Sequence, residues 1–337
     1  PAASVSELDG FDAVHPFGDK GLVRASSEWL SARKPDDRPF LLFVSFDNPH
    51  TICEYARGQH LPYGDVRPPA SVRDAPALPL NFANAPYSPQ ALNFEKEKAE
   101  AAYGTNHYTP DDWRRYRHAY AQLIERTDKE IGTVLDALDR LGLTNDSYII
   151  FTSDHGDGDA AHGWNQKTSL QEETIKVPLL ISGPGISSGV VSSQTVSLGL
   201  DLMPTLCGIA GIPAPTGTHG VNLLAEGRAP AESVTVETAF GTGTRPTTTG
   251  RAIVSNRYKY SVYSWGKHRE QLVDLLADPG ELQNLAEESA YDEVLDNFRE
   301  KLLNWCIDTH DDDFLKKLVL PTKTNGLVRD EIYAVPY

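Results

Sequence analysis

The most informative stretch of the sequence runs from Ser147 to Gly185 and reads SYIIFTSDHGDGDAAHGWNQKTSLQEETIKVPLLISGPG. It begins with an apolar, β-branched run at residues 148–152 and ends with a second apolar run at residues 177–182. Runs of this kind predict two buried strands. The loop between them is polar, and open α/β sheets bind their ligands in loops at the carboxyl ends of strands. The stretch therefore predicts an α/β fold with a functional loop.

The side chains of this loop suit the binding of a cation together with an anion. Asp154 and His155 follow the first strand directly, so a carboxylate and an imidazole can converge on one metal ion. Oxygen-rich sites favour calcium or magnesium. Lys167 can hold an anionic oxygen, and a metal combined with a lysine stabilises charge in phosphoryl or sulfuryl transfer. Composition alone allows an ordinary acidic surface loop equally well.

A family resemblance decides between these two readings. The loop resembles the second signature of the type I sulfatases, which belong to the alkaline-phosphatase superfamily, with Gln171 where the family usually has tyrosine. The resemblance implies that Asp154 and His155 bind the metal, with calcium favoured over magnesium. It also implies that Lys167 binds the sulfate and that His162 orients this lysine or meets the substrate. The matching residues are Asp154-His155-Gly156-Asp157, His162-Gly163-Trp164, Lys167, Glu172-Glu173 and Val177-Pro178-Leu179.

A second part of the expected site lies upstream. The apolar run at residues 40–46 predicts another buried strand, and it ends in Asp47-Asn48-Pro49-His50. By itself His50 fits a turn-capping histidine, but FVSFDNPH is similar to a sulfatase motif whose histidine contacts the sulfate ester and assists the leaving group. Residues 51–110 show little periodicity and predict a long loop. Because the family shapes its substrate pocket there, Arg57, His60 and Asp65 are weak candidates for substrate contact, and solvated loop side chains are the favoured alternative.

The remaining pattern completes the expected architecture. Helical spacing predicts helices at residues 19–30, 113–141, 200–210 and 291–305, and a short strand is predicted at 191–196. Four period-two segments, at 234–238, 251–254, 258–263 and 270–274, predict an antiparallel sheet with one exposed face. We expect a mostly parallel α/β sheet sandwiched by helices, as in alkaline phosphatase, with a smaller C-terminal antiparallel sheet and helix. The expected domains are 1–228, the C-terminal part of the sulfatase α/β domain, and 229–337.

Composition limits the partners. The 337 residues carry a formal net charge of −16, which argues against a nucleic-acid backbone and requires a local basic pocket for any anionic glycan. No apolar run is long enough to predict a transmembrane helix. The three cysteines form no Cys-x-x-Cys pair, so they predict neither a disulfide framework nor a zinc knuckle.

The beginning of the sulfatase pattern is not found in this sequence. No Asp-Asp pair follows an apolar N-terminal strand, and Cys53-Glu-Tyr-Ala-Arg57 matches only the outer spacing of the nucleophile motif. We therefore interpret Cys53 as a buried loop cysteine. The resemblance implies that formylglycine, the family's nucleophile, belongs to a preceding segment. The chain alone is expected to hydrolyse sulfate esters poorly or not at all.

The predicted function is a calcium-dependent sulfatase that removes sulfate from a sulfated carbohydrate. By resemblance to exported glycan sulfatases, the expected location is periplasmic or extracellular. Two alternatives stay open: a phosphodiesterase or phosphonate monoester hydrolase of the same superfamily, and a non-catalytic glycan-binding relative. The sequence does not predict the sugar, the sulfate position or the oligomeric state.

Overall fold

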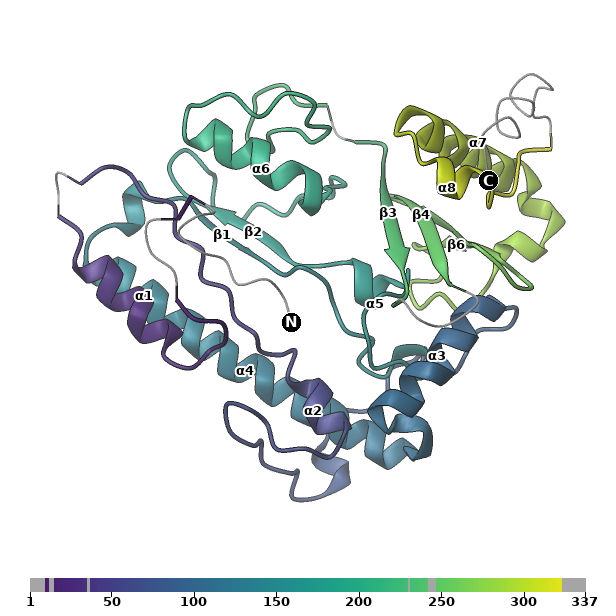
Figure 1. Cartoon of the computed structure of the whole chain (residues 1–337), viewed down its shortest axis with the longest axis horizontal. Helices are drawn as coiled ribbons and strands as arrows, with labels where there is room; N and C mark the ends of the chain where they lie inside the picture. Colours follow the sequence, from purple (N-terminus) through teal and green to yellow (C-terminus); the bar gives the residue numbers. More distant parts are fainter. Residues whose placement is uncertain (1–9, 12–14, 35–36, 230, 242–246, 323–337) are drawn as a thin grey trace. The chain divides into compact units, whose positions relative to one another are not determined.

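A computed structural model describes residues 10–11, 15–34, 37–229, 231–241 and 247–322 (Figure 1). These residues form two compact units, each assembled from separate segments of the chain. The first unit contains the residues up to 78, together with 101–151 and 180–186. The second contains residues 79–100 and 152–179 and the chain from 187 onward. The division predicted between residues 228 and 229 stays a prediction.

The first unit is built around one long helix. Helix α4 (Pro110–Arg140) begins at a capping box in which Thr109 and Asp112 bond each other's backbone, with Pro110 in the first turn. One face is buried through Trp113, Tyr116 and Leu123. Helices α1 (Leu22–Ser31) and α2 (Ile52–Ala56) both contact α4. The helices predicted at 19–30 and 113–141 are thus confirmed, and Cys53 is buried as expected, although it lies in α2 and not in a loop.

Strands β1 (Ile149–Thr152) and β2 (Leu179–Ser182) pair with each other, as the two apolar runs predict. The expectation that both are buried is wrong, because Phe151 and Leu180 are 41% and 59% exposed. The strand predicted at residues 40–46 is wrong: this segment forms no strand, and Leu41 and Phe43 are 58% and 54% exposed. A strand requires a hydrogen-bonded neighbour, and β1 and β2 are the only strands of their sheet within the described ranges. An apolar run alone does not supply that neighbour.

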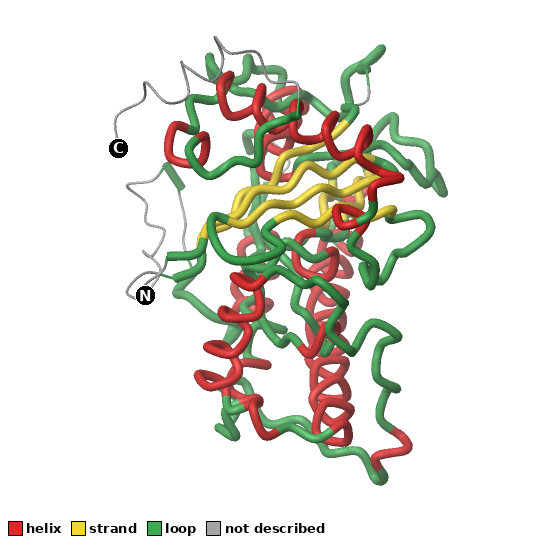
Figure 2. Tube along the Cα trace, turned by 90° about the vertical axis from the view of Figure 1, so that its right-hand side faces the viewer, coloured by secondary structure: helices red, strands yellow, loops and turns green. Residues whose placement is uncertain are grey.

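The second unit contains an antiparallel meander in the order β3 (Ser233–Ala239), β4 (Thr249–Ser255), β5 (Tyr258–Tyr263) and β6 (Glu270–Asp274). Figure 2 shows these strands in yellow. Tyr260 of β5 lies opposite Ile253 of β4 and Leu272 of β6. This sheet and the helix that follows it confirm the predicted C-terminal part of the fold.

Both faces of the antiparallel sheet are covered, so the expectation of one exposed face is wrong. On one side Tyr260 and Leu272 pack with Phe298 and Leu302 of helix α7 (Asp292–Asp308), and helix α8 (Asp312–Leu315) joins the same core. On the other side Tyr263 packs in a second core. That core also contains Ala91, Leu92, Trp164, Leu170, Phe240 and Ala252. Chain segments far upstream of the sheet therefore cover the face that its own sequence pattern leaves open.

Two further expectations differ from the structure. Residues 51–110 contain helix α3 (Gln90–Tyr103), which the weak apolar periodicity concealed because the helix buries little besides Ala91, Leu92 and Glu95. Residues 191–196 form no strand: Val191 is exposed, and Thr195 makes only an isolated bridge to Ala231. The remaining helices are α5 (Glu172–Ile175) and α6 (Leu198–Ile209), the latter predicted at 200–210. Single 3-10 turns lie at Val72–Asp74, Thr105–His107, Thr144–Asp146, Ala161–Gly163, Leu285–Glu287 and Ser289–Tyr291.

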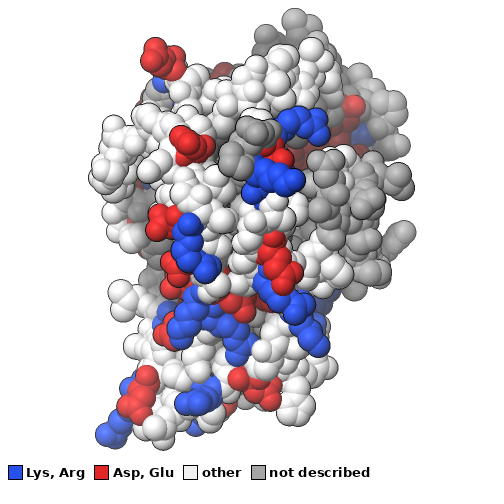
Figure 3. Space-filling view, turned by 90° about the vertical axis from the view of Figure 1, so that its left-hand side faces the viewer, with Lys and Arg blue, Asp and Glu red and all other residues white. Residues whose placement is uncertain are grey.

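Within the described ranges, no helix combines the length and the apolarity that crossing a membrane requires. On the face drawn in Figure 3, lysine and arginine side chains are interspersed with aspartate and glutamate.

Candidate functional site

The two expected metal ligands lie side by side at the end of β1. His155 Nε2 is 3.4 Å from Asp154 Oδ2, and the Asp154 side chain is largely exposed. The other ring nitrogen, Nδ1, is 2.8 Å from the carbonyl oxygen of Gly156, which accepts only if Nδ1 carries the proton. That tautomer leaves the lone pair on Nε2, beside the free carboxylate oxygen. The pair therefore fits a cation as two of the six to eight ligands, roughly, that calcium takes.

Two glycines set the path of the loop that carries these ligands. A Cβ atom added to Gly156 would lie 1.9 Å from the carbonyl oxygen of Glu173, and one added to Gly158 would lie 2.5 Å from that of Trp164. The Gly156 N–H donates to the carbonyl of Thr174 at 2.9 Å. The loop is thus pressed against the segment that leads into β2, and only glycine allows this approach.

Lys167 lies farther along the same loop, between buried residues on both sides. Trp164 and Leu170 belong to the core that covers the antiparallel sheet. The backbone N–H of Leu170 donates to the Tyr263 hydroxyl at 3.3 Å. Lys167 itself is half-buried. Packing within the second unit therefore fixes the backbone on either side of this lysine, while its long side chain retains access to solvent.

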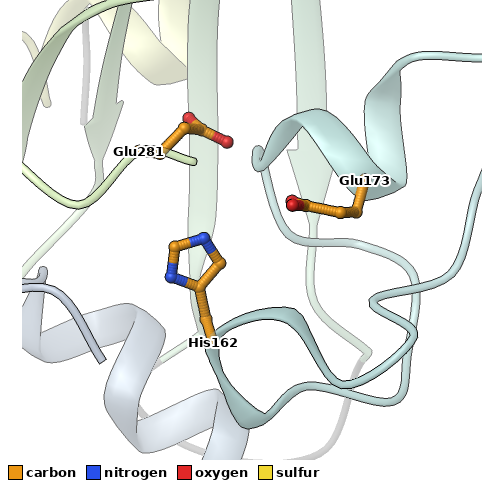
Figure 4. Close-up of side chains that lie close together, drawn as sticks. All are labelled: His162, Glu173 and Glu281. Carbon is orange, nitrogen blue, oxygen red and sulfur yellow. The ribbon is translucent and has the colours of Figure 1, made fainter. Parts of the chain in front are cut away.

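His162 is buried, with 5% of its surface exposed, and it faces two carboxylates (Figure 4). One ligand atom each from His162, Glu173 and Glu281 lie within 4.8 Å of one another. Asn81 joins the group: its Nδ2 is 2.7 Å from Glu173 Oε1 and 3.3 Å from His162 Nε2. The backbone fixes the histidine as well, because its N–H donates to the Asn81 carbonyl at 2.7 Å.

The surroundings of His162 favour its neutral form. Burial lowers the pKa of the imidazole, and the nearby ammonium groups of Lys259 and Lys96 lower it further, while Glu173 and Glu281 oppose the shift. Lys259 is buried in the same region, with Nζ 2.5 Å from Glu281 Oε1 and 3.3 Å from Glu172 Oε1. Its Nζ therefore bridges two carboxylates inside the second unit.

His50 lies in the first unit and is exposed at the end of a well-anchored turn. The carboxylate of Asp19 accepts the backbone N–H groups of Asp47 and Asn48 at 2.6 and 3.1 Å. The His50 N–H donates to the carbonyl of Asp47 at 2.9 Å. The backbone before His50 is therefore fixed, whereas its ring remains available to a ligand.

Arg57 ends helix α2 in the same unit as His50 and borders a groove of about 630 Å³. Its guanidinium lies 4.3 Å from the centre of the Tyr103 ring and 3.8 Å from Glu54 Oε1. His60 and Asp65 also line the groove and pair with each other at 2.7 Å. Grooves of this size accommodate small ligands.

The structure thus groups the predicted residues in two sets. His50 and Arg57 belong to the first unit, and Asp154, His155, His162 and Lys167 belong to the second. Sequence reasoning missed the partners of His162, because Asn81 and Glu281 are far from it along the chain. The only sequence signal for Glu281 is its place in Asp278-Pro-Gly-Glu281-Leu-Gln-Asn-Leu, which resembles a sulfatase turn motif.

Comparison with known proteins places this geometry in context. The family profile described as Sulfatase matches residues 13–212. The profile described as N-sulphoglucosamine sulphohydrolase, C-terminal, matches residues 160–307. A curated relative named Delta 4,5-hexuronate-2-O-sulfatase, from Bacteroides thetaiotaomicron, is 30% identical over 308 residues. That alignment covers 88% of this chain and 62% of the relative, so the chain spans less than two thirds of that protein.

Two solved structures are similar to the chain. A 2-O GAG sulfatase superposes with a TM-score of 0.75 and 26% identity, covering 94% of this chain and 71% of that one. The phosphonate monoester hydrolase of Agrobacterium radiobacter has a TM-score of 0.65 at 23% identity, covering 84% of this chain and 59% of that one. The second similarity reports the fold alone. Together with the family match, these structures confirm the predicted α/β fold.

Proposed function

Because the chain belongs to the sulfatase family, we propose that it forms the metal- and sulfate-binding part of a calcium-dependent sulfuric ester hydrolase. The substrate is a sulfated carbohydrate. The observation that carries this proposal is the loop after β1, where Asp154 and the Nε2 lone pair of His155 face the same space. Lys167 follows on that loop. A divalent cation and an ammonium group on one loop suit the charge of a sulfate ester.

Each residue takes a separate role. Asp154 and His155 supply part of the calcium shell, and bound calcium would polarise a sulfate oxygen. Lys167 pairs with a second sulfate oxygen, and the exposed imidazole of His50 donates a proton to the departing sugar oxygen. Arg57, at the groove of the first unit, binds an acidic group of the glycan. His162 is too buried to reach a sugar readily, so its role is to position the loop that carries Lys167.

The nucleophile lies outside these residues under this proposal. In the family it is formylglycine, made from a cysteine or serine of the nucleophile motif, and Cys53 does not fit that role because it is buried in α2. We further propose that the protein acts in the periplasm or outside the cell, where sulfated glycans are found. The named activity of the relative from Bacteroides thetaiotaomicron supports the choice of a glycan.

The test is an assay of the native protein that contains these residues, with a 2-O-sulfated unsaturated disaccharide as the substrate and sulfate release as the measurement. Removing a group that stabilises transition-state charge costs about 10²–10³-fold in rate. We therefore expect Lys167→Ala and His50→Ala to lose about that much of the calcium-dependent turnover. Lys176→Ala and His219→Ala serve as matched controls, because they remove an exposed lysine and an exposed histidine from other positions.

Three outcomes would contradict the proposal. Equal loss in the control variants would mean that the effect is not specific to Lys167 and His50. Faster cleavage of a phosphonate monoester than of the sulfate ester would favour the related hydrolase activity, which the fold also accommodates. Saturable binding of the disaccharide without any hydrolysis would indicate a glycan-binding protein.

A further inference from the structure

A second group of potential metal ligands lies in the second unit, apart from Asp154 and His155. His162 comes from the loop after β1, Glu173 from helix α5, and Glu281 from the turn after β6. Figure 4 shows the imidazole and both carboxylates directed toward a common space. Their nearest ligand atoms all lie within 4.8 Å of one another. The connection between β1 and β2 and the distant turn after β6 thus place one nitrogen and two oxygen ligand atoms together.

The charges around this space do not balance. Glu172, Glu173 and Glu281 bring three carboxylates, and Lys259 is the ammonium that pairs with Glu172 and Glu281. The other nearby ammonium, Lys96, pairs with Glu100 at 3.8 Å and donates to the carbonyl of His162. Two negative charges therefore remain beside the imidazole of His162. Uncompensated charge in a buried site is costly, so a compensating cation or protons are required.

One of the potential metal-binding oxygens also lacks a hydrogen-bond partner among the described residues. Glu173 Oε1 accepts from Asn81, but Glu173 Oε2 is buried and has no hydrogen-bond partner among the described residues. The oxygens of Glu281 accept from Lys259 and from the Glu172 N–H, and each carboxylate oxygen retains a second lone pair. Buried polar atoms are nearly always satisfied, so an unpaired carboxylate oxygen facing a histidine indicates a missing ligand.

We propose that His162, Glu173 and Glu281 bind a divalent transition-metal ion, with zinc as the representative ion. Imidazole nitrogen with carboxylate oxygen is a donor set that zinc accepts, at about 2.0–2.2 Å from each ligand. Around such an ion the three ligand atoms would lie roughly 3.4 Å from one another. Small side-chain rotations from the observed positions would bring them to that distance. A divalent ion cancels the two excess charges.

The bound ion has a structural role. His162 and Glu281 are 5% and 6% exposed, so a substrate has little access to the ion. The ion joins the loop that carries Lys167 to the turn that follows the antiparallel sheet. It would stabilise that loop in the same way that a structural zinc site stabilises a small domain. The inference does not depend on the reaction proposed above.

The test measures zinc on the full chain in a background that lacks the first pair of ligands. An Asp154→Asn, His155→Asn background removes binding at the end of β1, and metal content is measured by mass spectrometry after dialysis against zinc chloride. We expect one zinc per chain and a rise in Tm on zinc addition. Glu173→Gln, which keeps the shape of the side chain, and His162→Gln are each expected to weaken zinc binding at least 100-fold and to remove the Tm rise.

The matched control is another histidine–glutamate pair of the second unit. His268 Nδ1 is 2.7 Å from Glu287 Oε1, and both side chains are partly exposed. The variant His268→Gln, Glu287→Gln should keep both the bound zinc and the Tm rise. The proposal is overturned if the background chain binds no zinc at micromolar concentration. It is also overturned if zinc binding survives Glu173→Gln, or if the control variant loses zinc to the same extent. Circular dichroism is used to check that each variant folds. If His162→Gln does not fold, the result for Glu173→Gln decides whether the proposal holds.

Discussion

At the scale of single residues, Gly156 controls the loop that carries the candidate metal ligands. We expect Gly156→Ala to lower the free energy of unfolding by about 3 kcal/mol, because the added methyl group would lie 1.9 Å from the Glu173 carbonyl and would force the backbone apart. Urea denaturation of the purified variants measures this. Gly199→Ala is the control, since it adds the same methyl group at a position in α6 where no atom beyond the adjacent residues and the helix's own backbone lies within 4 Å. Equal destabilisation of both variants would contradict the steric explanation.

Part of the candidate site could be predicted from single residues and part could not. Asp154 and His155 follow a strand directly, so their adjacency was visible in the order of the sequence, and the structure places their ligand atoms 3.4 Å apart. The partners of His162 were not visible, because Glu281 reaches it only through the folding of the antiparallel sheet. Burial of His162 likewise results from contacts with distant segments, which no local pattern reports. The roles assigned to these residues in catalysis remain predictions.

At the scale of elements, the start of α4 depends on a titratable cap. Asp112 accepts from the Thr109 N–H and hydroxyl at 2.9 and 2.6 Å, and these hydrogen bonds lower its pKa below the ordinary value of 3.8. The ionised carboxylate is therefore favoured by folding, so its stabilisation is present above pH 3.8 and is lost as the pH falls through the lower pKa of the folded state.

This gives a pH-dependent prediction for Asp112→Asn. We expect the variant to be less stable than the parent by about 0.5–1 kcal/mol at neutral pH. The difference should disappear as the pH is lowered below 3.8. Urea midpoints of both proteins between neutral and acidic pH provide the measurement. Asp111→Asn is the control, because Asp111 lies in the same turn outside the capping box. A difference that persists unchanged at the lowest pH would show that ionisation of Asp112 does not stabilise the helix.

The elements that could be predicted are those whose local pattern agrees with their surroundings. Helix α4 has a cap, a buried stripe and an end, and the four strands of the meander alternate along the chain. Residues 40–46 show a strand pattern without a neighbouring strand in the described ranges, and α3 is a helix with few buried apolar residues. In both cases the outcome depends on what packs against the segment. The same cause explains why the second face of the antiparallel sheet was predicted to be exposed.

At the scale of the whole molecule, the net charge of −16 would repel the sulfated substrate proposed above. The face in Figure 3 mixes both signs of charge and does not form a broad basic surface. Under the proposed function, recognition of a sulfated glycan would depend on a few local groups such as Lys167 and Arg57. Added salt would weaken those local contacts but would also screen the repulsion between the approaching molecules.

The two sheets differ in how many of their strands have neighbours on both sides. Strand β5 lies between β4 and β6 and is almost fully buried, whereas β1 and β2 have only each other in the described chain. Amide protons exchange with solvent when local structure opens, and opening costs least where few contacts hold an element. Deuterium uptake should therefore be complete in β1 and β2 long before it begins in β5. Equal protection of these strands would mean that the short sheet has support beyond its own two strands, and that the loop bearing Asp154 and Lys167 is held more firmly than its hydrogen bonds indicate.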